Sequence, residues 1–344
     1  MTTEQFFMNK KHILLFSSDA TELYKADIFR VLALPNEHTI QFRYERKYVL
    51  DTLRDNPSAL VGRDAVIFFL AGNVKTTEPK DRVLTRYPIR ACKIKDAFHD
   101  KGTEQLILIL ELQGFTSCEI DADTDVHRLP LTAFVTEADL KDLRASSWID
   151  RVRAVEAHFE NTLFYRLEGV LLGTKLIKPS YSASRRRSFY ELIEEKEYSI
   201  ECNCYDRTGG VTPLQIRCES NDVFLLNLFE SGVRARLDTQ RIPLTTRGIT
   251  SGSAPAYAVF WTGESSQKDP NQLKLYWRIV RNPVKTTLFG VLTIAAAIGL
   301  GLSQRVFRDA TGNLVTLHDA LLQLLGVILL ALAAAQLFRF FNKT

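Results

Sequence analysis

The sequence predicts an α+β fold, in which β-rich cytosolic domains are joined by a long helix and followed by a C-terminal two-helix transmembrane hairpin. Three observations support this prediction. Residues 1–135 and 179–282 contain short runs of β-branched and aromatic residues between turn residues, a pattern typical of strands. Between them, within 136–178, apolar residues recur every three or four positions, as on a buried helix face. Residues 283–344 contain two long apolar runs without a charged residue.

Composition places few limits on function. The chain has 344 residues and a net charge of +4, which fits about two or three domains and does not by itself indicate nucleic-acid binding. The apolar run at 13–16 that precedes Asp19 is too short for the apolar core of a signal peptide. We therefore expect the large N-terminal part to remain in the cytosol and the five cysteines to be reduced.

The first 135 residues are predicted to form a mixed, β-rich domain. In 39–44, Ile40, Phe42 and Tyr44 alternate with polar residues, which indicates a half-buried strand. Continuous apolar character at 106–112 indicates a strand covered on both faces. Further strands are expected at 12–16, 65–70 and 89–94. Helical spacing at 19–33 would bury Leu23 with Ile28 and Val31, and 46–56 shows similar spacing.

A long connecting helix is expected after residue 136. Thr136 and Asp139 resemble a weak N-terminal cap, and Gly173 would end the helix. The apolar positions that share one face of this helix are Trp148, Val152, Val155, Phe159, Leu163, Leu167 and Val170. Packing in a core is the favoured interpretation, and a seam for self-association is the alternative.

A second β-rich domain is predicted for 179–282. Alternating apolar residues at 197–205 and 214–218 flank Gly209 and Gly210, which are suited to a tight turn, so these two runs are predicted to form a hairpin. The runs at 257–261 and 273–280 are predicted to pair in the same way.

The two apolar runs, 286–302 and 321–338, have basic residues on their flanks. The positive-inside rule then places both chain termini on the cytoplasmic side of the inner membrane. Small residues at four-residue spacing would let these helices pack closely in an oligomer; they are Ala295, Ala297, Gly299, Gly301, Ala331 and Ala335. A buried helical hairpin in a soluble domain is the alternative interpretation.

Two basic segments are the candidate ligand-binding residues. Arg43, Tyr44 and Arg46 combine cations with an aromatic ring, and the run Arg185, Arg186 and Arg187 follows a serine-rich loop. Guanidinium groups bind phosphate, and aromatic rings stack on bases, so we expect a nucleotide or protein ligand here. For the triple arginine, contact with anionic lipid headgroups is an alternative, and a solvated loop is the simpler interpretation.

Catalytic motifs are weak by comparison. Asp121, Asp123 and Asp125 would point the same way on an extended chain and could hold a divalent cation. A solvated acidic loop explains the same pattern. No other cofactor is predicted, and the chain shows no nucleophile motif of the G-x-S-x-G type.

The sequence leaves three hypotheses for the function of the chain. The first is a membrane-anchored sensor–effector that binds a ligand and acts through an oligomerising hairpin, in the manner of membrane-perturbing antiviral defence. The second is a membrane tether or scaffold for a binding module. The third is a membrane-bound, metal-dependent hydrolase that uses the three aspartates.

Overall fold

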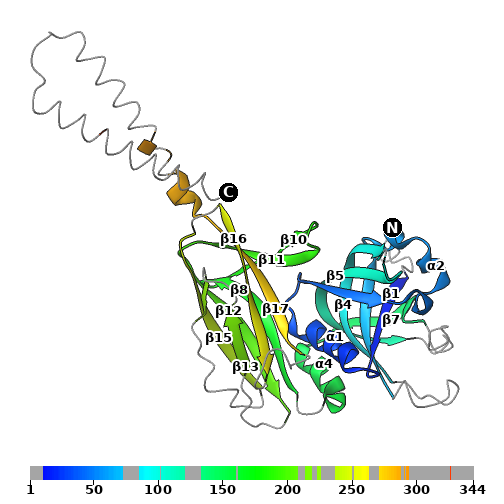
Figure 1. Cartoon of the computed structure of the whole chain (residues 1–344). Coiled ribbons are helices and arrows are strands. Elements are labelled where there is room, and N and C mark those ends of the chain that lie inside the picture. Colours follow the sequence, from blue (N-terminus) through cyan, green and yellow to red (C-terminus); the bar gives the residue numbers. More distant parts are fainter. Residues whose placement is uncertain are drawn as a thin grey trace, which may run out of the picture.

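A computed structural model describes residues 11–72, 85–100, 102–120, 133–159, 162–207, 214–218, 223–225, 237–249, 252–262 and 271–287, together with 290, 292, 293 and 326. These residues form two β-rich domains that lie side by side (Figure 1). Helices α1 (Glu22–Ala33) and α4 (Trp148–Val155) lie between the domains.

The first domain is built on a seven-stranded sheet of mixed direction. Its strand order is β2-β5-β4-β3-β1-β6, and β7 pairs with the end of β5. β1 and β3 run parallel, whereas the other neighbouring strands are antiparallel. The strands are β1 (His12–Ser18), β2 (Thr39–Tyr44), β3 (Asp64–Ala71), β4 (Thr85–His99), β5 (Leu106–Ile120), β6 (Val135–Ala138) and β7 (Leu140–Ala145).

The sheet is open and strongly curled, with β2 and β6 at the ends of the strand order (Figure 1). Short helical turns follow β2: η2 (Arg46–Tyr48), α2 (Asp51–Arg54) and η3 (Pro57–Leu60). Leu50 N donates to Val135 O at 2.9 Å, and Phe134 N donates to Tyr48 O at 2.7 Å. These bonds hold the segment after β2 against β6 and stabilise the curl.

The strands expected from the sequence at the start of the chain are all present. β1 and β3 are apolar on both faces because each face meets a different core. Leu15 belongs to the large core that runs through both domains, whereas Leu14 and Phe16 belong to a smaller cluster on the opposite face.

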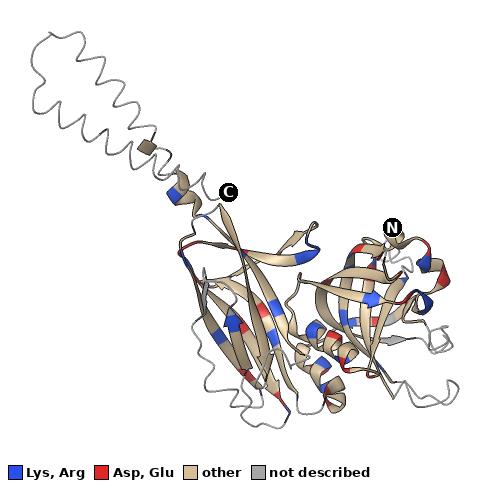
Figure 2. Ribbon diagram, in the orientation of Figure 1, with Lys and Arg blue, Asp and Glu red and all other residues tan. Residues whose placement is uncertain are grey.

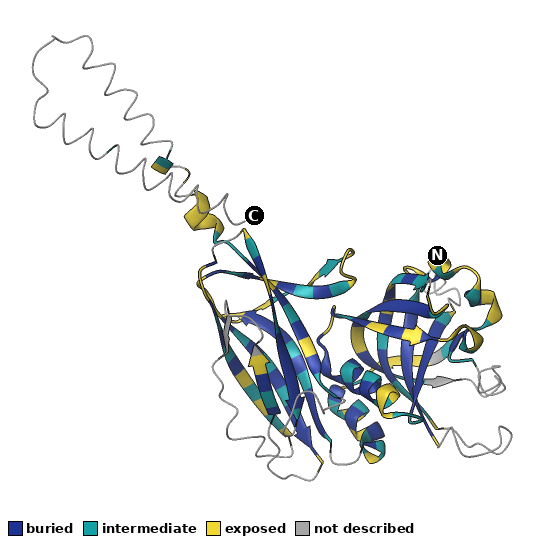
Figure 3. Ribbon diagram, viewed as in Figure 1, coloured by how far each residue is buried: buried dark blue, intermediate teal, exposed yellow. Residues whose placement is uncertain are grey.

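Helix α1 belongs to the first domain and packs against the second. Thr21 begins it, since the Thr21 side chain accepts a hydrogen bond from Tyr24 N at 3.3 Å. Phe29 lies on its buried face, and its ring centroid is 6.0 Å from Phe164 and 5.2 Å from Tyr165 in the second domain. The core is therefore continuous across the domain boundary (Figure 3).

The second domain consists of two five-stranded sheets, ordered β10-β11-β17-β16-β13 and β14-β15-β12-β8-β9. Tyr165 of the second sheet lies 6.4 Å, between ring centroids, from Phe260 of the first, so the sheets pack face to face. The strands are β8 (Leu163–Leu172), β9 (Lys175–Ile177), β10 (Ser180–Ser182), β11 (Arg187–Ile193), β12 (Glu197–Asp206), β13 (Leu214–Cys218), β14 (Val223–Leu225), β15 (Leu237–Thr246), β16 (Ser253–Thr262) and β17 (Leu273–Val280).

The predicted long connecting helix is wrong. Residues 136–178 contain most of β6, then β7, α4, η5 (Glu156–His158), β8 and β9. Helical spacing holds only in α4, which begins where the Ser147 side chain accepts from Asp150 N at 3.1 Å. Leu163, Leu167 and Val170 continue the spacing but lie in β8, where pairing with β12 determines the structure.

The predicted hairpin of 197–205 with 214–218 is also wrong. β12 lies between β15 and β8 in one sheet, whereas β13 pairs with β16 in the other. Alternation identified both strands, but it carries no information about which strands pair. The predicted pairing of 257–261 with 273–280 is confirmed, because β16 and β17 are antiparallel neighbours.

The transmembrane part of the predicted fold class is contradicted as well. Within the part of the chain that the structure describes, no helix combines the length and the apolar character needed to cross a membrane. Residues 283–287 are helical, and most of 283–344 lies outside the described residues. The predicted packing residues Ala295, Ala297, Gly299, Gly301, Ala331 and Ala335 lie there too. The prediction rested on the apolar runs and their basic flanks, and neither pattern by itself establishes a membrane-spanning helix.

Candidate ligand-binding site

Two residues fasten the domains together. Thr39 N at the start of β2 donates to Ser188 Oγ in β11 at 3.1 Å, and Ser188 N donates to Thr39 Oγ1 at 2.8 Å. We call this reciprocal pair the interdomain clasp. Ser188 lines two cavities of similar volume, about 500 Å³ and about 530 Å³, so the clasp borders both.

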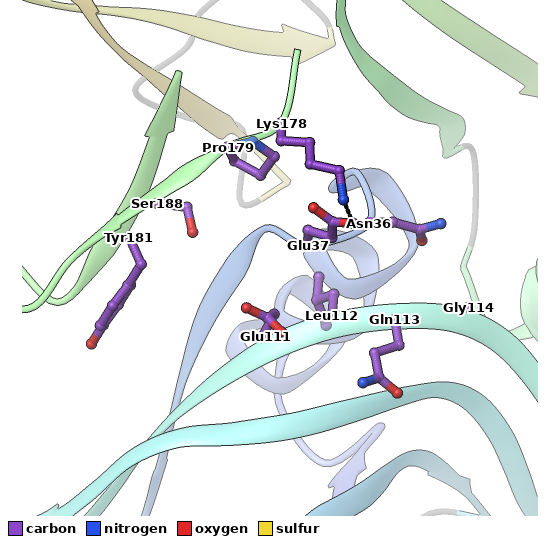
Figure 4. Close-up of a pocket in the computed structure, with 10 residues that line it drawn as sticks. All are labelled: Asn36, Glu37, Glu111, Leu112, Gln113, Gly114, Lys178, Pro179, Tyr181 and Ser188. Atoms are coloured by element: carbon purple, nitrogen blue, oxygen red, sulfur yellow. Dashed lines mark hydrogen bonds and ion pairs between the residues drawn. The ribbon is translucent and has the colours of Figure 1, made fainter. Parts of the chain in front are cut away.

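The smaller cavity, here called the polar cavity, carries charges that are already paired (Figure 4). Glu37 Oε1 accepts from Lys178 Nζ across the domain boundary at 3.1 Å. Glu111 lies 2.7 Å from Lys95 Nζ. The residues that line this cavity are Asn36, Glu37, Glu111, Leu112, Gln113, Gly114, Lys178, Pro179, Tyr181 and Ser188.

Among the described residues, four cations and one carboxylate line the larger cavity, here called the basic cavity. Its cations come from four elements: Arg30 from α1, Arg43 from β2, Arg187 from β11 and Lys274 from β17. The carboxylate is Asp27 of α1. Figure 2 shows Lys and Arg on α1, at the start of β11 and on β17, which border this cavity.

Among the described residues, most of this positive charge has no carboxylate partner. Arg30 Nη1 lies 2.7 Å from Asp27 Oδ1, which leaves the other three cations. Within the described residues, Arg43, Arg187 and Lys274 form no ion pair. Burial raises the pKa of Asp27, although Arg30 and Arg43 act in the opposite direction. The basic cavity therefore has a field that attracts anions.

Aromatic rings support two of these cations. The Arg187 guanidinium lies 3.9 Å from the centroid of the Tyr276 ring, and Lys274 Nζ lies 5.6 Å from that of Tyr257. The two tyrosine rings are themselves 5.8 Å apart. Cation–π contacts hold these side chains in place without neutralising them.

His38 forms part of the cavity wall and is only 3% exposed. Its ring stacks on Tyr190 with centroids 5.7 Å apart. Burial, with a contribution from Arg90, lowers the pKa of His38 to about 3, so the ring is neutral at physiological pH. Among the described residues, His38 Nδ1 has no hydrogen-bond partner.

Arg90 holds the surrounding elements in position, although it lines neither cavity. The side chain is fully buried, and Nη1 donates to Val31 O at 2.6 Å and to Leu34 O at 2.7 Å, at the C-terminal end of α1. Nη2 donates to Asn36 Oδ1 and Nε to Gln113 O, each at 2.7 Å. Burial lowers the pKa of Arg90 to about 9, so the guanidinium remains charged at neutral pH. Arg90 thereby ties α1 to the polar cavity.

The structure brings together two of the predicted ligand-binding residues, Arg43 and Arg187, which come from separate segments. Tyr44 lies in the core, and its hydroxyl donates to Phe16 O at 3.3 Å. Arg46 pairs with Asp55 at 3.2 Å, outside both cavity linings.

The other two arginines of the triple run lie outside the basic cavity. Arg186 lies 3.5 Å from the centroid of the Phe98 ring, with Nε 3.5 Å from Asp96 Oδ2. Arg185 is exposed on the turn between β10 and β11, and its backbone N–H donates to Ser182 Oγ.

The predicted metal site lies outside the described residues, since Asp121, Asp123 and Asp125 are not among them. Where the structure does describe the chain, no group of three or more His, Cys, Asp and Glu side chains is arranged to hold a metal ion.

Sequence reasoning missed several residues of the basic cavity. Leu23 was expected in a buried face, yet it is 63% exposed and lines the cavity beside Tyr24. Lys274 and Tyr276 do alternate with the buried residues of β17, and this was the available signal. His38 stands alone in the sequence, and no pattern there marks it.

No family model matches the chain, and no curated protein matches it. The similar solved structures include the S-layer protein rSbsC(31-844), with 7% identity and a TM-score of 0.19 over 27% of this chain. The chain spans 12% of that structure's length. The S-layer protein SbsC domains 4 and 5 match at 8% identity and a TM-score of 0.19, over 48% of this chain and 90% of that one. Domains 1-6 of surface layer protein SbsC match at 7% identity and a TM-score of 0.20, over 72% of this chain and 28% of that one. TM-scores this low do not indicate a shared fold.

Proposed function

We propose that the chain is a two-domain binding module, which holds an anionic ligand in the basic cavity. The ligand would carry carboxylate or phosphate groups together with an apolar part. The observation that carries this proposal is the convergence of Arg43, Arg187 and Lys274, which form no ion pair within the described residues, on one interdomain cavity.

A bound anion would stabilise the arrangement of cations in the basic cavity. Like charges gathered in a cavity repel one another, and an unliganded protein gains nothing from that arrangement. An anion that enters the cavity removes the repulsion and forms charge-assisted hydrogen bonds with the guanidinium groups. The Arg30–Asp27 pair shows that α1 can neutralise a cation where no ligand is needed.

The cavity also offers apolar surface. Leu23 and Tyr24 of α1 are exposed there, and Ile40 and Leu273 contribute to the wall. Pockets of this size use apolar contacts for affinity and a few polar groups for orientation. A ligand that joins an acidic group to an apolar one would use both kinds of surface.

Calorimetric titration of the full chain tests this proposal. The probes are an acetylated, amidated heptapeptide of alternating Glu and Val (the acidic peptide), adenosine monophosphate and inorganic phosphate. We expect at least one probe to bind, with an affinity that falls as salt is added, because exposed charges are screened.

Charge reversal locates the binding. The double variant Arg43→Glu, Lys274→Glu should weaken the affinity at least about tenfold, since each reversal replaces an attraction by a repulsion. Lys178→Glu is the matched control, because Lys178 lines the polar cavity. An equal loss in the control, or no binding by any probe, would contradict the proposed function.

A further inference from the structure

Among the described strands, β2 pairs only with β5, and its other edge carries residues that line the basic cavity. Leu112 N of β5 donates to His38 O at 2.8 Å, whereas Thr39 N donates to the side chain of Ser188 on the opposite side. Backbone groups alternate sides along an antiparallel strand. The N–H and C=O groups of Gln41 and Arg43 therefore point away from β5, as those of Thr39 do.

The residues that carry these backbone groups, Thr39, Gln41 and Arg43, all line the basic cavity. Within the described part of the chain, no hydrogen bond reaches the backbone N–H of Gln41 or Arg43. An unpaired edge of this kind is a template for another extended chain.

We propose that the basic cavity binds an extended acidic peptide segment, which adds to the free edge of β2 as a further strand. This inference rests on the proposed function and names the class of partner. Main-chain hydrogen bonds to Gln41 and Arg43 would supply part of the affinity, and Arg43, Arg187 and Lys274 would select acidic side chains.

The side-chain pattern of the partner follows from the alternation of β2. Gln41 and Arg43 are exposed, whereas Ile40 and Phe42 are buried. Neighbouring strands of one sheet place side chains on the same two faces. Acidic residues of the added strand would lie beside Arg43, and the alternate residues, facing the other way, would be apolar.

A peptide fits this cavity better than a nucleotide. Arg187 already covers the ring of Tyr276, and Lys274 lies over that of Tyr257, so a base could stack on either of these two rings only by displacing a cation. A nucleotide would also leave the backbone groups of Gln41 and Arg43 without partners. The edge from Thr39 to Arg43 has the length of a short strand, about 3.4 Å per residue, which a heptapeptide covers.

The experiment compares the acidic peptide with two N-methylated forms of it. One form is methylated on its Glu nitrogens and the other on its Val nitrogens. An added strand bonds to β2 through one edge only, so one form should lose at least about tenfold in affinity while the other binds like the parent peptide. NMR-detected amide exchange of the ¹⁵N-labelled full chain should slow at Gln41 and Arg43 when the parent peptide is bound.

The outcomes separate this inference from the proposed function. If both methylated peptides bind like the parent and exchange at Gln41 and Arg43 is unchanged, strand addition is excluded, although the anion site stands. If adenosine monophosphate or phosphate binds in an Arg43-dependent manner and the peptide does not, the partner class is wrong. If no probe binds, both the inference and the proposed function fail.

Discussion

The basic cavity and the polar cavity share Ser188 of the clasp in their linings and are nearly equal in volume. They differ in how many of their charged side chains form ion pairs. In the polar cavity, Glu37 pairs with Lys178 and Glu111 with Lys95. In the basic cavity, only Arg30 has a carboxylate partner among the described residues. The two cavities cannot be told apart by volume, so the proposed ligand site rests on the difference in ion pairing.

Arg90 donates hydrogen bonds to residues of both cavities, Leu34 in the basic one and Asn36 and Gln113 in the polar one. Its removal should have the largest effect on the free energy of unfolding. Arg90→Ala would leave the carbonyl groups of Val31, Leu34 and Gln113 without their buried donor. We expect the free energy of unfolding to fall by about 3–5 kcal/mol, which is usual when a buried charged network is broken. Denaturant titration measures this loss.

A matched control for this variant is Arg153→Ala, because Arg153 is an exposed arginine of α4. It should change the free energy of unfolding by about 0.5 kcal/mol or less. Similar losses in the two variants would show that Arg90 does not have the structural role assigned to it.

His38 lines the basic cavity and not the polar one. Its protonation should make the stability of the basic cavity depend on pH. Its pKa in the folded state, about 3, lies below its ordinary value of 6.5. The neutral ring therefore contributes stability above pH 6.5, and this contribution is lost as the pH falls toward 3. The slope it adds to the free energy of unfolding approaches about 1.4 kcal/mol per pH unit.

His38→Phe isolates this effect, since phenylalanine can keep the stacking on Tyr190 and does not titrate. The difference in stability between the wild type and the variant should change between pH 6.5 and 3. A difference that is constant over this range would show that His38 does not enter the folded core as a neutral ring.

Loss of the clasp should have a smaller effect on stability and should disturb both cavities. Thr39→Val with Ser188→Ala removes both side-chain acceptors of the reciprocal pair. We expect a loss of about 1–2 kcal/mol in the free energy of unfolding, because two backbone N–H groups lose their partners.

Ser182→Ala serves as the control, since among the described residues the Ser182 side chain hydrogen-bonds only within its own turn, to Ser184 Oγ and Arg185 N. If the clasp variant is as stable as this control, the two hydrogen bonds do not fasten the domains.

The sequence predicted features that depend on neighbouring residues, and it did not predict those that depend on contacts between distant segments. Alternation at Ile40, Phe42 and Tyr44 is a local property, and β2 was predicted correctly from it. The spacing of Leu163, Leu167 and Val170 suits a helix, but pairing with β12 overrides it. Strand partners, such as β16 for β13, are set by the tertiary fold and leave no local signal.

The candidate site shows the same limit. Arg43 and Arg187 both stand near aromatic residues in the sequence, but they meet in one cavity because the two domains pack against each other, with Thr39 bonded to Ser188. Leu23 has helical spacing suited to burial, yet it faces the cavity and remains exposed. The sequence therefore predicted part of the chemistry of the site and not its location.

The most direct test of the account is chemical-shift mapping of the acidic peptide on the ¹⁵N-labelled full chain. Binding in the basic cavity should shift the amide signals of Gln41, Arg43 and Lys274, and leave those of Glu37 and Gln113 unchanged. Shifts confined to Glu37 and Gln113 would place the ligand in the polar cavity. That result would contradict the claim that uncompensated charge marks the binding site.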